Sequence, residues 1–498
     1  MSTSRVLRNA SLLGVAQAVS MAAGFVSTAW LARMLGPEAY GIIGFGTAFV
    51  SYFALAVVFG TDLYGTREIA SAPDRTRALL SRILGVRLIL LVLVGTVYVA
   101  VISAIDRPRD VIVVMFIQIL GLLSAAVTVD FLFQGVQRMG PVAIRQGGAA
   151  LAGMIAVLVL IRGPGDVFTA AAIPFSVMLI SAVLLCAFAH RRITPVGFSF
   201  DPAGLKDVLI GSAPILLAGL MTVVFLNVDV VMLGFLRPAE EVGIYAGMGR
   251  LFVLSMFVGH IVTAAFAPAL AAAAADPDEK RATYYRHIRI AVFLGTPVCA
   301  AMIAFPGWVI QLVFGEKFVA GAPILSLLEI AAILSYACMA PLTALVSWRD
   351  QTAQMVILAV VAAANVALNF WLIPVHGGIG AAIATLAAQT IMFALLVFRV
   401  RSRFGLFGFL PAGGVIVCAA VGFALSAFVA SILTAGNDVF SVWIAPFLLV
   451  LGGAGSYVAM TYAVGIVRRA DFTAVVYVLR NRDAVHRNAE GSDSTNGQ

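Results

Sequence analysis

The sequence predicts an all-α, polytopic membrane protein with about 14 transmembrane helices, and three observations carry that prediction. First, 62% of the 498 residues are hydrophobic, only 11% are charged, and the mean hydropathy is +1.03. No globular surface is that apolar, so a soluble protein is excluded. Second, the apolar residues gather into runs of roughly the ~20 residues that cross a ~30 Å hydrocarbon core. Third, the basic residues alternate between the two sides of successive runs.

The chain begins with a predicted helical hairpin. Residues 10–32 carry no charge, the run stops at Arg33, and Gly36-Pro37 predicts a tight turn before a second apolar run over 41–60. The first run is too long for the hydrophobic region of a cleavable signal peptide. Another span follows it rather than an exported domain, so we expect the first run to remain in the protein as a membrane helix.

The same criteria predict fourteen spans joined by short loops, which leaves no room for an extramembrane catalytic or receptor domain. The predicted spans are residues 10–34, 41–60, 83–105, 111–134, 146–162, 167–189, 208–235, 242–270, 288–314, 322–347, 354–374, 379–398, 406–434 and 440–466. An echo of the first hairpin recurs at 228–234 and 242–245 and suggests two related halves. The polar stretch 471–498 predicts a cytoplasmic tail that is disordered at its end.

The charge pattern predicts the orientation. About 25 of the 32 basic residues fall on one side of the predicted spans, whereas about 6 fall on the other. Those six are Arg33, Arg107, Arg109, Arg162, Arg237 and Lys317, and Arg250 lies within a span. The positive-inside rule therefore predicts that both termini are cytoplasmic. The net charge of +8 is topological, with some affinity for anionic lipid headgroups, and does not indicate nucleic-acid binding.

Two residue types within the spans bear on motion and redox chemistry. Helix-breaking prolines favour bent helices that act as hinges or line cavities. These prolines are Pro174, Pro214, Pro268, Pro297, Pro306 and Pro341. The cysteines lie in apolar runs without metal-ligand spacing or a disulfide framework, so we interpret them as small core residues. They are Cys186, Cys299, Cys338 and Cys418.

Ionisable side chains inside a membrane are costly, so each one is a functional candidate. Asp229 near the end of the seventh span and Arg250 near the start of the eighth lie at similar depths, which allows an ion pair. Such a pair either fixes the hairpin or faces a cavity and opens for an anionic ligand. Glu329 in the tenth span is the most deeply placed acid and a candidate proton or cation site. His260 is expected to be a hydrogen-bonded interior histidine that could also relay protons.

Polar amides in the spans have two interpretations, contacts between helices or contacts with a ligand. We favour ligand contact for Gln17 and Asn365, and contacts between helices for Gln118, Asn227, Asn369 and Gln389. Asp62, Asp130 and Arg33 lie near span ends, where they could simply reach headgroups, although Arg33 is also a candidate substrate-binding residue. Soluble catalytic motifs are missing, including a phosphate-binding loop with lysine, an Asp-rich metal motif and a nucleophile elbow. We therefore expect no metal, no cofactor and no ATP hydrolysis.

Several motifs, in order, resemble one family. They are LARMLGPEAYG after the first span, TREIA after the second, NVDVVMLG ending the seventh, EEVGIYAGMGRL opening the eighth and VFGEKF ending the ninth. With fourteen spans, residues 5–470 resemble the polysaccharide transporters, the Wzx-type O-antigen flippases of the multidrug/oligosaccharidyl-lipid/polysaccharide exporter superfamily. Lipid II flippases of that superfamily carry arginines where this chain has Met21 and Ser27, which argues against a peptidoglycan role.

The resemblance implies an architecture and an activity. It implies two six-helix lobes, residues 1–200 and 201–403, followed by two further helices in 404–470. It also implies that the chain flips an undecaprenyl-diphosphate-linked oligosaccharide across the inner membrane by alternating access, with a glycan polymerase and chain-length proteins as partners. The alternatives are an ion-coupled antiporter of the MATE type and a membrane-embedded glycan polymerase or ligase. An acid-dominated cavity would favour the antiporter, and a large outward loop with Arg and His would favour the polymerase.

Overall fold

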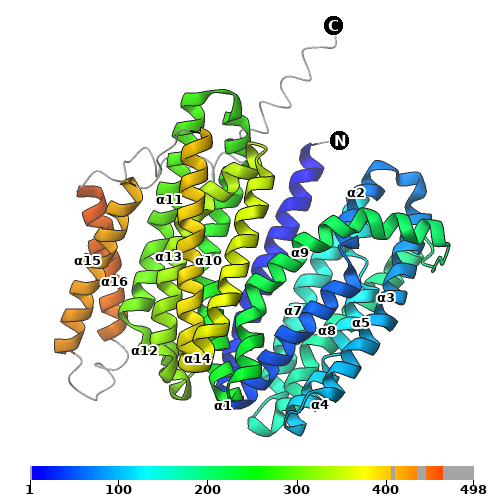
Figure 1. Ribbon diagram of the computed structural model, residues 1–498, viewed down its shortest axis with the longest axis horizontal. Coiled ribbons are helices and arrows are strands. Elements are labelled where there is room, and N and C mark those ends of the chain that lie inside the picture. Colours follow the sequence, from blue (N-terminus) through cyan, green and yellow to red (C-terminus); the bar gives the residue numbers. More distant parts are fainter. Residues whose placement is uncertain (1–2, 405–409, 434–444, 464–498) are drawn as a thin grey trace. The chain divides into compact units, whose positions relative to one another are not determined.

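The computed structural model describes residues 3–404, 410–433 and 445–463, and every regular element in those ranges is a helix (Figure 1). The α-helices are α1 (Thr3–Val58), α2 (Thr61–Ser71), α3 (Thr76–Ala104), α4 (Arg109–Ile117), α5 (Leu120–Val127), α6 (Asp130–Gly135), α7 (Gly140–Leu160), α8 (Val167–Arg192), α9 (Pro202–Leu236), α10 (Ala239–Ala272), α11 (Pro277–Ala304), α12 (Pro306–Val313), α13 (Ala322–Ser347), α14 (Gln351–Phe404), α15 (Leu410–Leu433) and α16 (Ala445–Ala463). Short 3₁₀ turns η1 (Pro73–Arg75), η2 (Pro164–Asp166), η3 (Ala273–Ala275) and η4 (Glu316–Gly321) join several of them. The predicted tail lies outside the described residues.

The predicted fold class is confirmed. Ten helical segments of the described chain are long and apolar enough to cross a membrane. Two of these segments contain α1 and α14, which each hold two of the predicted spans on either side of a bend. The apolar helices α15 and α16 stand where the last two spans are predicted. The chain is therefore an all-helical, multi-pass membrane protein.

Glycine makes the two bends within α1 and α14. Gly36 has φ 77° and Gly377 has φ 56°, values in the left-handed region that side chains disfavour. A Cβ atom on Gly377 would also lie 2.0 Å from a carboxylate oxygen of Glu241. The loop expected at Gly36-Pro37 is thus a sharp kink with helix on both sides.

Two compact units divide the chain. The first contains residues 1–247, 313–318 and 369–381, and the second contains 248–312, 319–368 and 382–498. The first unit therefore includes α9 together with α1 to α8. The division into six-helix lobes at residues 200 and 403 stays a prediction.

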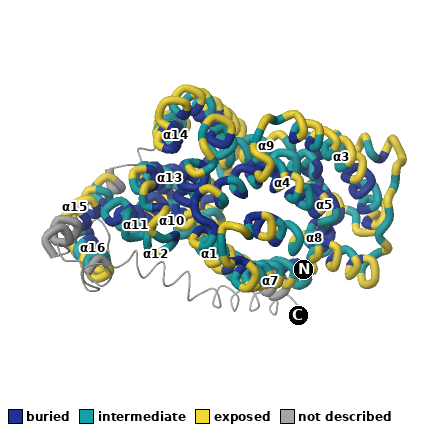
Figure 2. The backbone as a smooth tube through the Cα atoms, turned by 90° about the horizontal axis from the view of Figure 1, so that it is seen from below, coloured by how far each residue is buried: buried dark blue, intermediate teal, exposed yellow. Residues whose placement is uncertain are grey.

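Apolar side chains cover the outer faces of many helices. Figure 2 shows exposed and buried positions alternating along the helices. On α3 the exposed positions include Val92, Leu93 and Val97, which share one face. In water such a surface would cause aggregation, whereas in a bilayer it contacts lipid tails. The exposed apolar residues therefore agree with a membrane location.

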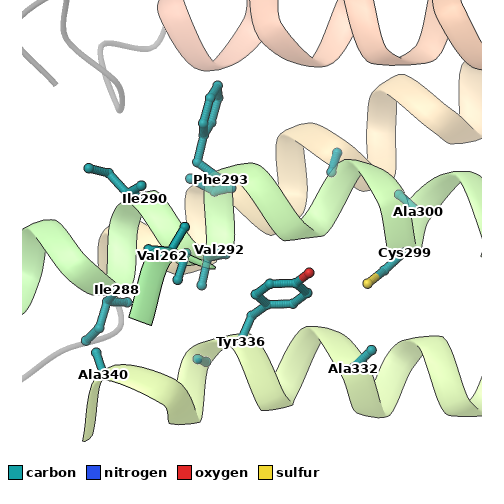
Figure 3. Packing of buried hydrophobic residues seen from close by; sticks show 14 of the residues in the cluster. Val262, Ile288, Ile290, Val292, Phe293, Cys299, Ala300, Ala332, Tyr336 and Ala340 are labelled. Carbon is teal, nitrogen blue, oxygen red and sulfur yellow. The ribbon is translucent and has the colours of Figure 1, made fainter. Parts of the chain in front are cut away.

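The second unit is built around α11, whose side chains form a buried cluster with α13, α15 and α16 (Figure 3). Pro297 in α11 has no N–H, so it leaves the carbonyl of Phe293 without its usual helical donor. The Tyr457 hydroxyl of α16 donates to that carbonyl at 2.8 Å, and the two rings stack at 5.4 Å. A break in one helix is thus satisfied by a side chain from another. Pro306, by contrast, does not interrupt a helix, because it is the first residue of α12.

An ion pair stabilises the connection between α13 and α14. Asp350, in this connection, accepts hydrogen bonds at 2.8 and 2.9 Å from Arg399 in the last turns of α14. These bonds lower the pKa of Asp350 below its ordinary value. Nearby, the Lys280 ammonium lies 4.3 Å from the centroid of the Trp348 ring and 4.6 Å from that of Phe404. These polar contacts join segments at one end of the second unit.

Candidate functional site

Three of the motifs that carry the resemblance meet in the first unit. A Cβ atom on Gly41 would lie 1.9 Å from the carbonyl oxygen of Ala239, and one on Gly243 would lie 1.8 Å from that of Pro37. Two glycines thus let the backbones of α1 and α10 touch. Beside them, the rings of Tyr40 and Phe318 pack edge to face at 5.9 Å. Residues 31–41, 240–247 and 313–318, which come from three of the motifs, therefore form one junction within the first unit.

Three of the six basic residues predicted to face outward bind carbonyl groups at or near helix ends. Arg33 donates to the carbonyl of Val313 at 2.9 Å, and Arg107 donates to that of Phe235 at 2.6 Å. A cation is favourable there, because the C-terminal carbonyls lack helical donors and carry the negative end of the helix dipole. Similarly, Arg237 donates to the carbonyl of Pro374 at 3.4 Å, just before the bend at Gly377. Arg33 thus links α1 to α12, and its role in substrate binding stays a prediction.

Asp229 joins three helices of the first unit. Its carboxylate accepts a hydrogen bond at 2.6 Å from the hydroxyl of Tyr245 on α10. Its other oxygen accepts one from the amide of Asn369 on α14. The contact by Asn369 agrees with the expectation that this amide joins helices. Asp229 is half-buried on α9, and its pairing with Arg250 stays a prediction.

The other candidates differ in their exposure. Arg250 is exposed on α10, and Gln17 is exposed on α1, whereas Asn365 is buried on α14. His260 is also exposed, so the expectation of an interior histidine is wrong. α10 has no strong apolar stripe along one face, so the sequence does not show which of its residues point inward. Ligand and ion-coupling roles for these residues stay predictions.

Glu329 on α13 is fully buried in the second unit. Neither carboxyl oxygen has a hydrogen-bond partner within the described residues. The Ser255 hydroxyl of α10 and the Cys299 thiol of α11 lie beside it. Glu329 is therefore an acid buried inside the protein, and its role as a proton or cation site stays a prediction.

Arg87 is a buried residue whose importance the sequence analysis missed. The charge pattern places Arg87 among the roughly 25 basic residues predicted on the cytoplasmic side, yet its side chain is fully buried on α3. Its guanidinium donates to Thr61 at 2.8 Å, to Asp62 at 2.6 Å, and to the carbonyls of Ala125 at 3.4 Å and Thr128 at 2.7 Å. Those carbonyls belong to the C-terminal end of α5, where the fourth predicted span breaks. Arg87 therefore caps a helix end inside the protein.

A second buried ion pair lies in the same unit. Arg145 on α7 binds Asp130, the first residue of α6, through both oxygens of the carboxylate, with one bond of 2.9 Å. Only 12% of the Arg145 side chain and 15% of the Asp130 side chain are exposed. Asp130 is therefore held inside the protein and the expectation that it reaches headgroups is wrong, whereas Asp62 binds Arg87 with 48% of its side chain exposed, so its contact with headgroups stays a prediction. The available signal was Arg87 itself, which lies inside the predicted span 83–105.

The buried amide of Gln118 joins two helices of the first unit. The Gln118 amide, buried where α4 ends, donates at 3.2 Å to both the carbonyl of Ile43 and the hydroxyl of Thr47 on α1. It thus joins helices, as expected. Within the described ranges no three His, Cys, Asp or Glu side chains gather in a way that could hold a metal ion.

Comparison with known sequences gives the family. Residues 6–274, more than half of the chain, match the polysaccharide biosynthesis protein family. The chain is 27% identical over 146 residues to the teichuronic acid biosynthesis protein TuaB of Bacillus subtilis (strain 168), which covers 29% of this chain and 30% of that protein. It is 24% identical over 234 residues to a "Putative O-antigen transporter" of Shigella dysenteriae, covering 46% and 58%. These matches span less than two thirds of the length of each curated relative.

Comparison with solved structures gives the fold. The lipid II flippase MurJ in an inward closed conformation matches with a TM-score of 0.72 at 13% identity, over 95% of this chain and 99% of that one. An inward-facing multidrug resistance MATE transporter of the MOP superfamily matches with a TM-score of 0.63 at 14% identity, over 77% and 95%. Both matches agree with the helical, multi-pass architecture. This chain, a membrane protein with a transporter fold, belongs to the polysaccharide biosynthesis protein family.

Proposed function

We propose that the protein flips an undecaprenyl-diphosphate-linked oligosaccharide, a precursor of O-antigen, capsule or exopolysaccharide, across the cytoplasmic membrane by alternating access. The family match over residues 6–274 carries this proposal. The name of the Shigella relative describes O-antigen transport, and the MurJ structure is named a lipid II flippase. Both names concern lipid-linked or lipid-derived glycans. A glycan polymerase and chain-length proteins would act on the product.

The chemistry of such a substrate sets the demands on the protein. A diphosphate and a sugar chain cannot cross hydrocarbon unaided, whereas the polyprenyl tail stays in lipid. The protein must therefore supply cations and hydrogen-bonding groups within the membrane. Arg250 is an exposed cation on a membrane helix, and a guanidinium matches phosphate oxygens with paired donors. We assign the diphosphate to Arg250, and we keep Gln17, Asn365 and Arg33 each as a separate candidate for contact with the substrate.

The direct test is flipping in proteoliposomes, with a fluorescent undecaprenyl-diphosphate-linked disaccharide as the probe. The protein should expose the probe to a membrane-impermeant quencher on the far leaflet faster than empty vesicles do. A MATE-type antiporter would leave this probe in place and would instead export a cationic dye. Dye export without flipping would therefore replace the proposal with the antiporter.

A series of Arg250 variants tests whether this side chain binds the diphosphate. Arg250→Lys keeps the charge but loses the paired donors, so binding of farnesyl diphosphate should weaken about tenfold, and Arg250→Ala should weaken it further. Both variants should accumulate normally in the membrane. Asp229→Asn removes the negative charge that could pair with Arg250. Its side-chain oxygen can still accept the hydrogen bond from Tyr245. If Arg250→Ala with Asp229→Asn flips normally, Arg250 only balances charge and does not bind the diphosphate.

The proposed orientation has its own test. With both termini cytoplasmic, cysteines introduced at Gly165 and His376 face outward, and cysteines at Ser71 and Ser402 face inward. All four positions are exposed in the structure. In intact spheroplasts an impermeant maleimide should label the first two and spare the others. The opposite pattern would invert the topology.

A further inference from the structure

The surroundings of Glu329 allow its ligand to be inferred. The carboxyl lies in the apolar cluster between α10, α11 and α13, with no exposed surface. The titratable groups that act on it are the Cys299 thiol of α11 and the Tyr336 phenol of its own helix. Figure 3 shows the Tyr336 hydroxyl and the Cys299 thiol pointing toward each other between α11 and α13. No cation from the described part of the unit is paired with the carboxyl.

The hydroxyl groups around the carboxyl have already used their protons. The Ser255 hydroxyl donates to the carbonyl of Phe252 at 2.8 Å. The Tyr336 hydroxyl donates to the backbone carbonyl of Ser255. Each oxygen therefore remains as an acceptor, and the thiol is only a weak donor. A neutral carboxyl fits these surroundings, because its O–H can donate to an acceptor, whereas a carboxylate would lack strong donors.

Packing holds this arrangement in place. Gly259 and Gly295 leave room for the Tyr336 ring, since a Cβ atom on either would lie within 2.7 Å of it. The ring fills the space between α10 and α11 and fixes its hydroxyl against Ser255. The acceptors beside the carboxyl are thus preorganised rather than free to rotate toward it.

A sodium ion does not suit the same site. Alkali and alkaline-earth cations bind several hard oxygen ligands, preferably carboxylates, carbonyls and water. Here one carboxyl and one serine hydroxyl supply the oxygens, and a soft thiol occupies the third side. The site is also closed to water. A proton needs only one of these oxygens.

We propose that Glu329, with Ser255 and Cys299 as positioning residues, forms a buried site that binds and releases a proton and does not bind sodium. This proposal rests on the proposed function for its use, since it names the coupling ion of the flippase. The binding event itself requires no lipid-linked substrate.

The experiment is infrared difference spectroscopy on the purified, full-length protein in nanodiscs, without substrate. Raising the pH should remove the C=O stretching band of the protonated Glu329 carboxyl group. The Glu329→Gln variant should lack that band. Glu68→Gln, a change at an exposed glutamate, is the matched control and should keep it. Ser255→Ala and Cys299→Ala should each move the pH midpoint of the band, and unchanged midpoints would overturn their assignment as positioning residues.

Sodium separates the two possible ligands. At constant pH, replacing choline chloride with sodium chloride should leave the Glu329 band unchanged. Loss of the band on addition of sodium would overturn the proposal, because it would show a cation displacing the proton. A band that persists in Glu329→Gln would also overturn it. A normal proton signal in a protein that does not flip the probe would leave this site in place and refute only the flippase.

Discussion

In the first unit, Arg87 and Asp130 are buried with an opposite charge at hydrogen-bonding distance. In the second unit, Glu329 is buried among a hydroxyl, a thiol and a phenol. Burying a charge is costly unless hydrogen bonds and a counter-charge replace water. The first unit provides both, so its charges can remain permanently inside. Among the described residues of the second unit no counter-charge is paired with Glu329, so we expect this acid to be neutral, with a proton that can leave when the surroundings change.

The comparison separates structural from responsive ionisable groups. A fully paired guanidinium such as Arg87 ties together several helix ends and gains nothing from changing its state. A buried acid without a cation has two protonation states that depend on its surroundings. Four changes of side chain test this distinction, and the first should have the largest effect.

Arg87→Ala should break the paired network. The change leaves the carbonyls of Ala125 and Thr128 without their donor inside the protein and opens a cavity. We expect a loss of about 2–5 kcal/mol in the free energy of unfolding, measured by SDS titration in mixed micelles. Arg82→Ala is the matched control, because that side chain is 39% exposed and 3.9 Å from Asp201. Equal losses in both variants would mean that Arg87 is not a structural centre.

Asp130→Asn should have the next largest effect. The amide keeps the shape of the carboxylate but leaves the nearly buried charge of Arg145 without its partner. The same titration should show a loss of about 2–4 kcal/mol. Adding Arg145→Gln should recover part of that loss, since the stranded charge is then removed. A double variant less stable than Asp130→Asn would contradict a simple ion pair.

Tyr457→Phe tests a neutral buried contact in the second unit. The variant loses the hydroxyl that donates to the carbonyl left open by Pro297, and we expect a loss of about 1 kcal/mol in the free energy of unfolding. In a Pro297→Ala background the backbone N–H can donate to Phe293 instead, so the loss should shrink. Tyr462→Phe, an exposed change on the same helix, is the control. An equal loss in both backgrounds would rule out this compensation.

Glu329→Gln should have the smallest effect on stability and so give the sharpest contrast with Asp130→Asn. Both variants replace a buried acid by its amide, but Glu329 has no cation to strand. The expected change in unfolding free energy at pH 7 is within about 1 kcal/mol. A loss as large as that of Asp130→Asn would mean that Glu329 is charged and paired in the native protein.

The sequence predicted the fold because the relevant signals are local. The lengths of the apolar runs, the alternation of basic residues and the Gly36-Pro37 pair each lie within a few residues of the feature they predict. The deep position of Glu329 followed from its place in one run. Arg87 could not be interpreted this way, because its partners lie up to 41 residues away on other helices.

The breaks in the fourth predicted span are a second feature that the sequence did not predict. It divides into α4, α5 and α6 at Gln118-Ile119 and at Thr128-Val129, and none of these four residues is a proline or a glycine. These breaks depend on tertiary contacts, including the hydrogen bonds from Arg87, and so a local pattern cannot show them. The predicted interior position of His260 was wrong for a related reason. Long apolar helices in a membrane have weak amphipathicity, so the sequence does not show which face of α10 points inward.

The bond between Tyr457 and Phe293 has a consequence for the order of assembly. The two residues are 164 positions apart, and the donor follows the acceptor. A ribosome therefore delivers α11 to the membrane well before it makes α16, the helix that carries the donor. The contact from Tyr457 to the break at Pro297 thus forms late in biogenesis, and a chain released before residue 457 lacks it.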